Sequence, residues 1–191
     1  MEIDQSWFAP GRRWFVAVTL PDAIKDDLAA LRIEASGIRW TPREQMHLTL
    51  RYIGGADSEI IQRLAKGLGR IAVEPFLLTP EGVGRFPPRG NPRVFWGGVG
   101  SGHPRLFQLQ GKVEEAVIAA GLEPETRRFH PHITLARIKP AASGSINDFL
   151  KRHRNYIGGP FRVDAFSLWV SYLQADGPVH HRAAEYQLEK P

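Results

Sequence analysis

One tetrapeptide occurs twice in this chain, and its repetition restricts the possible folds more than any other feature. His47-Leu48-Thr49-Leu50 returns 85 positions later as His132-Ile133-Thr134-Leu135. At the same offset the chain continues to match itself without a gap, as far as Pro75-Phe76 against Pro160-Phe161. A self-match at one fixed offset indicates an internal duplication, so we expect one structural unit to be built twice.

The order of sequence patterns within each copy predicts this unit. Residues 13–20 are rich in β-forming residues and precede a segment with apolar residues at helical spacing. Residues 46–53 alternate apolar and polar side chains, which is typical of a strand with one face in the core. An amphipathic segment over 60–71 follows, and the second copy repeats the order from residue 94. The predicted unit is strand, helix, motif strand, helix and strand.

Two copies of this unit predict an α+β fold with two lobes. We expect two α+β lobes related by a pseudo-twofold axis, with the two motif strands at equivalent places on either side of a shared cleft. The chain has 191 residues, of which 42% are hydrophobic. This size suits a single domain over residues 1–191, made of two intertwined pseudo-symmetric lobes.

Composition excludes several classes of chemistry. The chain has no cysteine, so disulfides, thiol nucleophiles and cysteine-ligated zinc are excluded. No apolar run approaches the length of a membrane span, and no charged-then-apolar leader is recognisable. We therefore expect a cytoplasmic monomer with no membrane association.

The charge balance is compatible with a phosphate-rich partner. Lys and Arg number 25 against 20 Asp and Glu, which gives a formal net charge of +5. Guanidinium groups match phosphate oxygens well. An arginine-rich composition also arises from a GC-rich genome, so charge alone leaves a nucleic-acid partner undecided.

The repeated motif carries groups suited to phosphoryl chemistry. Side chains alternate along a strand, so His47 and Thr49 should share one face about 7 Å apart, as should His132 and Thr134. Facing histidines can act as a base and an acid at neutral pH, because an imidazole titrates near pH 6.5. Threonine hydroxyls can donate hydrogen bonds to phosphate oxygens. The four side chains are thus candidates for one anion site.

Several arginines are candidates for holding an anionic substrate. By strand alternation, Arg51 shares the face of His47 and Thr49, whereas Arg137 lies on the face opposite His132 and Thr134, so parity favours Arg51. Arg128 stands just before the second motif. A Gly- and Pro-rich stretch over 82–92 could line the cleft or could merely connect the lobes. Arg85 and Arg89 lie within this stretch, and Arg93 follows it directly.

Metal binding is the competing chemistry. His130-Pro131-His132 has the His-x-His spacing found in many zinc sites. No carboxylate stands close by to complete the ligand set, and Gln45 occupies the place before His47 that corresponds to His130. We expect no catalytic metal and no other cofactor. The remaining histidines are expected to be solvated: His103, His153, His180 and His181.

The paired motifs resemble the signature of the 2H phosphoesterase superfamily. Within it the chain is most similar to the RNA 2′,3′-cyclic phosphodiesterases, historically called 2′-5′ RNA ligases. The resemblance covers about residues 12–173, in order and at the family's spacing. It rests on residues 13–21, 47–54, 93–96 and 129–137.

The resemblance implies a reaction and roles for the motif residues. It implies two antiparallel sheets related by the pseudo-twofold axis, with helices on the outside and a central cleft. This cleft would hydrolyse RNA 2′,3′-cyclic phosphate ends to 2′-phosphates without a metal. His47 would protonate the 3′ oxygen, His132 would activate water, and Thr49 and Thr134 would bind the phosphate. Arg137 lies within the closely matching segment and could reach the site from the end of its strand.

Some implications stay open at this stage. The family often has Gly-Pro-x-Tyr near the end, where base-stacking contacts are expected, whereas this chain has Gly177-Pro178-Val179-His180. The RNA could be a tRNA fragment, and cyclic nucleotides are an alternative substrate. Ligation and RNA-end binding without turnover are the rival functions. Two titrating histidines favour turnover, and the abundance of water favours hydrolysis unless the site excludes it.

Overall fold

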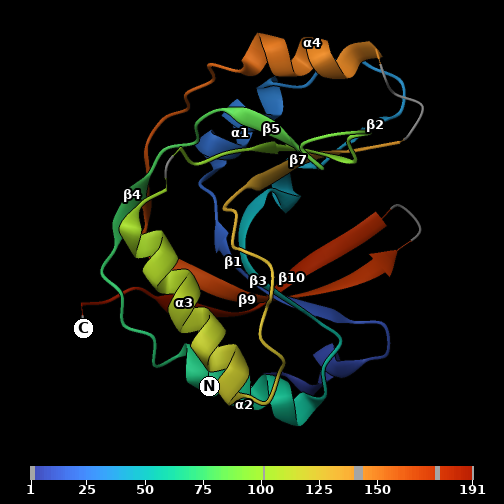
Figure 1. Ribbon diagram of the computed structural model, residues 1–191. Helices are drawn as coiled ribbons and strands as arrows, with labels where there is room; N and C mark the ends of the chain where they lie inside the picture. Colours follow the sequence, from blue (N-terminus) through green and yellow to red (C-terminus); the bar gives the residue numbers. More distant parts are fainter. Residues whose placement is uncertain (1–2, 101, 140–143, 175–176, 191) are drawn as a thin grey trace.

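The structure is a computed structural model that describes residues 3–100, 102–139, 144–174 and 177–190 (Figure 1). The α-helices are α1 (Asp22–Ala30), α2 (Ser58–Leu68), α3 (Pro104–Ala119) and α4 (Gly144–His153). Short 3-10 helices cover Gln5–Phe8 and Arg43–Gln45. The strands are β1 (Arg13–Thr19), β2 (Ile38–Trp40), β3 (His47–Gly54), β4 (Phe76–Leu78), β5 (Val83–Phe86), β6 (Val94–Gly97), β7 (Ile133–Ile138), β8 (Phe161–Val163), β9 (Ala165–Gln174) and β10 (Gly177–Gln187).

One continuous sheet passes through both lobes. Its strand order is β10-β9-β1-β3-β7-β6-β5, with β2 also paired to β7, while β4 and β8 form a separate two-stranded sheet. The pairings between these strands are antiparallel. In Figure 1 the first lobe, with β1, β3, β9 and β10, lies below the second, with β2, β5 and β7. The α+β fold class expected from the repeat is confirmed.

The two lobes meet where residues of one copy pair with their own equivalents in the other. Leu48 of β3 pairs with Ile133 of β7, and Leu77 of β4 pairs with Arg162 of β8. Each pair is separated by the 85 positions of the repeat. Directly opposed residues of an antiparallel ladder are related by a local twofold axis. The pseudo-twofold axis of the duplication therefore passes through both contacts.

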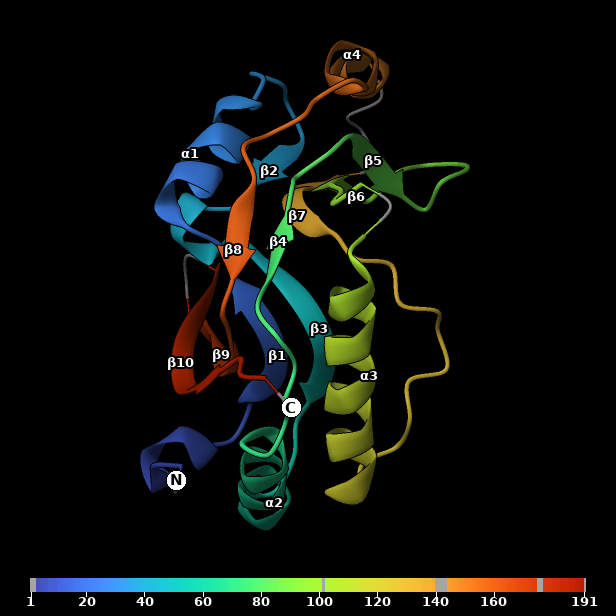
Figure 2. The ribbon, with the colours of Figure 1, turned by 90° about the vertical axis from the view of Figure 1, so that its left-hand side faces the viewer.

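The lobes exchange elements between the two copies of the unit. β5 ends the first copy but pairs with β6 of the second, and β9 ends the second copy but pairs with β1 of the first. The helices exchange as well. Leu28 of α1 lies against Gly97 of β6, and Figure 2 shows α3 running alongside β3. Each lobe is thus assembled from both halves of the chain.

The hydrophobic core lies between the sheet and its covering helices. In β1, Trp14, Val16 and Val18 are almost fully buried, and the leucines of both motifs are buried too. Ile61 and Leu64 of α2 are three positions apart and have no exposed surface, as expected for the apolar stripe of an amphipathic helix. Each such side chain contributes about 1.5–3 kcal/mol through burial. With one face of the motif strands committed to the core, their other face is left for a site.

Both motif strands carry a β-bulge at the second aliphatic residue of the motif. Along β1, Ala17 pairs with Thr49 and Val16 with Arg51, so Leu50 has no partner. Along β6, Trp96 pairs with Thr134 and Phe95 with Ala136, so Leu135 has none. An unpaired extra residue inverts the alternation of the side chains that follow it. The two bulges occupy equivalent positions, so the duplication has preserved the irregularity together with the motif.

Within the residues that the structure describes, no helix has both the length and the apolar character needed to cross a membrane.

Candidate active site

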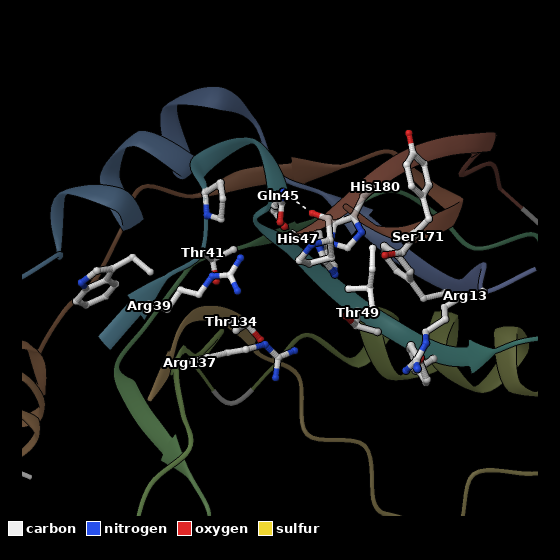
Figure 3. A pocket seen from close by; sticks show the side chains of 18 residues that line it. Arg13, Arg39, Thr41, Gln45, His47, Thr49, Thr134, Arg137, Ser171 and His180 are labelled. Carbon is white, nitrogen blue, oxygen red and sulfur yellow. Dashed lines mark hydrogen bonds between the residues drawn. The ribbon is translucent and has the colours of Figure 1, made fainter. Parts of the chain in front are cut away.

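A pocket of about 470 Å³ lies on the inner face of the motif strands (Figure 3). Three motif side chains line it: His47 and Thr49 from β3, and Thr134 from β7. Among the described residues that form the wall there is no aspartate or glutamate. Its other polar side chains include Arg13, Arg39, Tyr52, Arg137, Ser171 and His180. The pocket is therefore suited to an anion.

The ring of His47 is held in one orientation by its surroundings. Its Nδ1 lies 2.7 Å from the carbonyl oxygen of Gln45, to which it donates a hydrogen bond. The side chain of Gln45 in turn donates from Nε2 to the carbonyl oxygen of Pro178, at 2.8 Å. The ring stacks on Phe15 with centroids 4.8 Å apart and meets His180 edge-on at 5.5 Å. This arrangement leaves Nε2 of His47 for chemistry in the pocket.

Burial controls the proton affinity of His47. Desolvation of the charged ring lowers the pKa of His47 to about 4, against the opposing effect of the hydrogen bond to Gln45. Positive charge on His180 and on His132 lowers this pKa further. His47 is thus neutral in the free protein at neutral pH.

His132 repeats the backbone contact of His47 in a different environment. Its Nδ1 lies 2.7 Å from the carbonyl oxygen of His130, again two residues earlier in the chain. The ring packs edge-on against Phe86 at 5.0 Å and near Trp96 at 6.5 Å. Burial lowers the pKa of His132 below its usual value. His132 does not line the pocket itself, but positive charge on His132 contributes to lowering the pKa of His47.

The structure places Arg51 away from the pocket, so the prediction from strand alternation was wrong. Its Nε lies 2.8 Å from a carboxylate oxygen of Glu114, and it donates to the carbonyl oxygen of Glu123 at 2.6 Å. The bulge at Leu50 is the cause, because it turns the next side chain to the opposite face. The bulge at Leu135 has the converse effect and brings Arg137 onto the pocket face.

The other predicted arginines lie outside this pocket. Arg128 lines a second pocket of about 460 Å³, together with Trp96 and Phe129. Arg85 donates to the carbonyl oxygens of Pro88 and Gly90 within its own loop. The Gly- and Pro-rich stretch is the β5–β6 hairpin, and none of its arginines lines the pocket that contains His47.

Sequence reasoning missed several residues of the wall, among them Arg13, Arg39, Tyr52 and His180. His180 was expected to be solvated, which was wrong, because it contacts both His47 and Phe15. Tyr52 occupies the position equivalent to Arg137 in the repeat. One signal for the bulge was present in the sequence. Leu135 and Ala136 are adjacent apolar residues, both buried in the structure, and they interrupt the apolar–polar alternation of the motif strand.

No metal site is evident among the described residues. No group of three or more His, Cys, Asp or Glu side chains is placed to hold an ion there. The rings of His130 and His132 have centroids 6.2 Å apart. Metal independence stays a prediction.

Comparison with known proteins identifies the family. Residues 20–174 match the sequence model of the 2′-5′ RNA ligase superfamily. The chain belongs to this superfamily. The resemblance drawn from the motifs is thereby confirmed.

Relatives and solved structures agree with this membership. The chain is 35% identical to the RNA 2′,3′-cyclic phosphodiesterase of Aeropyrum pernix, over 72% of this chain and 78% of that protein. It is 33% identical to the Thermus thermophilus RNA 2′,3′-cyclic phosphodiesterase, over 92% and 90%. Its fold is similar to that of TT0787 from Thermus thermophilus, with a TM-score of 0.77 and 28% identity over 93% and 98% of the chains. E. coli LigT in its apo form gives a TM-score of 0.78 at 25% identity, over 94% and 98%.

Proposed function

We propose that this protein hydrolyses the 2′,3′-cyclic phosphate ends of RNA to 2′-phosphates, using His47 and His132 as an acid–base pair without a metal. The observation that carries the proposal is the matched tethering of the two histidines. Each Nδ1 donates to the carbonyl oxygen two residues earlier, at 2.7 Å in both copies. The neutral tautomer is then fixed with Nε2 unprotonated, ready to accept or, once charged, to donate a proton.

The reaction needs one proton removed and one delivered. A water molecule attacks the phosphorus, the bond from phosphorus to the 3′ oxygen breaks, and the product carries a 2′-phosphate and a free 3′-hydroxyl. In this scheme His132 accepts the proton of the attacking water and His47 protonates the departing 3′ oxygen. Each such transfer typically contributes about 10²–10⁴-fold to the rate.

The low pKa of His47 makes its acid role depend on the substrate. In the free protein the half-buried ring is neutral at pH 7. A phosphodiester anion bound next to the ring raises its pKa, because the opposite charge stabilises the imidazolium. His47 therefore takes up its proton together with the anionic substrate. The mechanism thus requires no proton on His47 before binding.

The other polar side chains of the pocket would hold the phosphate. The hydroxyls of Thr49 on β3 and Thr134 on β7 can donate hydrogen bonds to the two non-bridging oxygens of the phosphate. Arg137 lines the same pocket and adds positive charge on the side of Thr134 (Figure 3). Several relatives named RNA 2′,3′-cyclic phosphodiesterase support this substrate class.

A single incubation tests the reaction and its rivals. An RNA oligonucleotide ending in a 2′,3′-cyclic phosphate is incubated with the protein, and the phosphorus of the product is followed by ³¹P NMR. We expect a 2′-phosphomonoester resonance to replace that of the cyclic diester. A new 2′-5′ diester formed with an added 5′-hydroxyl RNA would favour ligation. Binding without any change in the resonance would favour an RNA-end binding module.

A further inference from the structure

We infer that the end of the pocket formed by Arg13 and Tyr52 binds a second phosphate, the internucleotide phosphate that precedes the terminal nucleotide of the RNA. The inference rests on the proposed function, because it extends the same pocket from the cyclic end to the adjoining backbone. It assigns to the pocket a substrate of at least two nucleotides.

The position of Arg13 is suited to the neighbouring backbone group. Arg13 lies two residues before Phe15 on β1, and the ring of Phe15 stacks on His47. Residues two apart on a strand lie on the same face, about 7 Å from each other. Figure 3 shows Arg13 at one end of the pocket and Arg39 and Arg137 towards the other, with His47 and Thr49 between them. A second anion at Arg13 would therefore lie beside the reaction centre without occupying it.

The charge around Arg13 is uncompensated. Among the residues that the structure describes, Arg13 forms no ion pair with a carboxylate, and its Nη1 donates to the hydroxyl of Tyr52 at 3.3 Å. By contrast, five described arginines outside the pocket are each paired with a carboxylate: Arg43, Arg51, Arg105, Arg127 and Arg182. The cation at this end of the pocket is thus available to a ligand.

Neighbouring hydroxyls complete a set of donors. The Tyr52 hydroxyl accepts its hydrogen bond from Arg13, so its own proton is available to another acceptor. Ser171 is the cross-strand partner of Arg13 on β9 and lines the same pocket. Tyr172 beside it is fixed, because Arg12 lies 3.8 Å above its ring centroid and His181 stacks parallel to it.

This donor set fits a phosphate better than a nucleobase. A guanidinium group supplies donors only, and the two hydroxyls can act as donors as well. A phosphodiester presents acceptors only, as the N7/O6 edge of guanine does, whereas the Watson–Crick edge of each base mixes donors and acceptors. The phosphate is the acceptor-only group that every nucleotide carries, and it is also an anion. Contacts to the backbone are also independent of the base sequence. The end of the pocket at Arg13 should consequently recognise chain length rather than sequence.

The test compares three substrates that differ by one charge or one nucleotide. They are adenosine 2′,3′-cyclic phosphate, the dinucleotide ApA with a 2′,3′-cyclic end, and the same dinucleotide with a neutral methylphosphonate linkage. In Arg13→Gln we expect kcat/KM for the phosphodiester dinucleotide to fall at least about tenfold more than that for the mononucleotide, through loss of charge-assisted hydrogen bonds. With the wild-type protein, kcat/KM for the methylphosphonate dinucleotide should be lower than that for the phosphodiester dinucleotide by about the same factor. Arg13→Gln should lower kcat/KM for the methylphosphonate dinucleotide little further. Tyr52→Phe should show the same selectivity with a smaller loss.

Controls separate this inference from the proposed function. Arg70 is an exposed arginine outside the pocket, and Arg70→Gln should change none of the three rates. An equal loss with all three substrates, or no loss in Arg13→Gln, would overturn the second phosphate site. If the wild-type protein hydrolyses none of them, the proposed function fails. In that case calorimetry compares the binding of two 2′-phosphorylated dinucleotides, one with a phosphodiester linkage and one with a methylphosphonate linkage. Equal affinities would reject the second phosphate site, and weaker binding of the methylphosphonate ligand would support it.

Discussion

The two motif strands share one backbone arrangement but place their histidines in different surroundings. Both rings donate from Nδ1 to the carbonyl oxygen two residues earlier, and both strands bulge at the same repeat position. His47 is enclosed by Phe15 and His180, and burial lowers its pKa to about 4. His132 lies against Phe86 and outside the pocket wall. The backbone contacts set the tautomer in both copies, while the surrounding side chains set the proton affinity of each ring separately.

The largest expected effect comes from replacing each histidine in turn, which tests whether both rings are needed for catalysis. His47→Ala and His132→Ala should each lower kcat at least about 10²-fold, because each removes one proton-transfer group. Steady-state kinetics on a cyclic-phosphate RNA measures the loss, and circular dichroism verifies that the variants remain folded. Near-wild-type activity in either variant would contradict the shared role of the two rings.

The threonines test whether the two strands contribute equally to phosphate binding. Thr49→Ala and Thr134→Ala should each lower kcat/KM on the order of tenfold, since each deletes one hydrogen bond to developing charge. Thr→Ser at each position is the matched control, because it keeps the hydroxyl. Rates unchanged by either alanine variant would exclude that hydroxyl from the phosphate site.

Arg51 and Arg137 offer a matched pair on the two strands. Arg137→Gln should raise KM about tenfold through loss of a charged contact to the phosphate. Arg51→Gln should leave the kinetics near wild type but lower the free energy of unfolding by about 1–3 kcal/mol, because it leaves Glu114 without its partner. Urea denaturation measures the second effect. The opposite pattern would mean that the bulges do not orient these side chains as described.

The repeat alone predicted much of this architecture, and the remainder depended on pairing between distant segments. The offset and the alternation within residues 46–53 identified the motif strands, because both signals are local. Alternation assumes an unbroken ladder, so the bulges at Leu50 and Leu135 reversed the expected places of Arg51 and Arg137. His180 was missed because only the pairing of β10 with β9 brings it beside His47.

The difference in proton affinity gives a pH prediction. kcat/KM reports the ionisations of the free protein, and activity requires one ring charged and the other neutral. The pKa of His47 lies at about 4 and that of His132 is also lowered, both through burial. The kcat/KM profile should therefore have its optimum on the acid side of pH 6.5. Bound anion raises both pKa values, so the kcat profile should lie at higher pH. A kcat/KM optimum above pH 6.5 would contradict this account.

The smallest expected effect concerns metal ions. The described residues offer no cluster of metal-binding side chains around either histidine, so activity should be unchanged in excess EDTA. The assay is the same cyclic-phosphate hydrolysis after prolonged chelation. Loss of activity with recovery on adding zinc or manganese would instead assign His130 and His132 to a metal.

The exchange of β5 and β9 between the lobes has a consequence for how the chain folds. Each half of the sequence lacks one of the two strands that pair with its own first strand, so neither half contains all the hydrogen bonds of a complete lobe. Most stabilising contacts therefore form only between residues that are far apart in sequence. We expect the folding rate to be low for a chain of this length. Unfolding should be a single cooperative transition, and two fragments divided at the repeat boundary should acquire structure only when mixed.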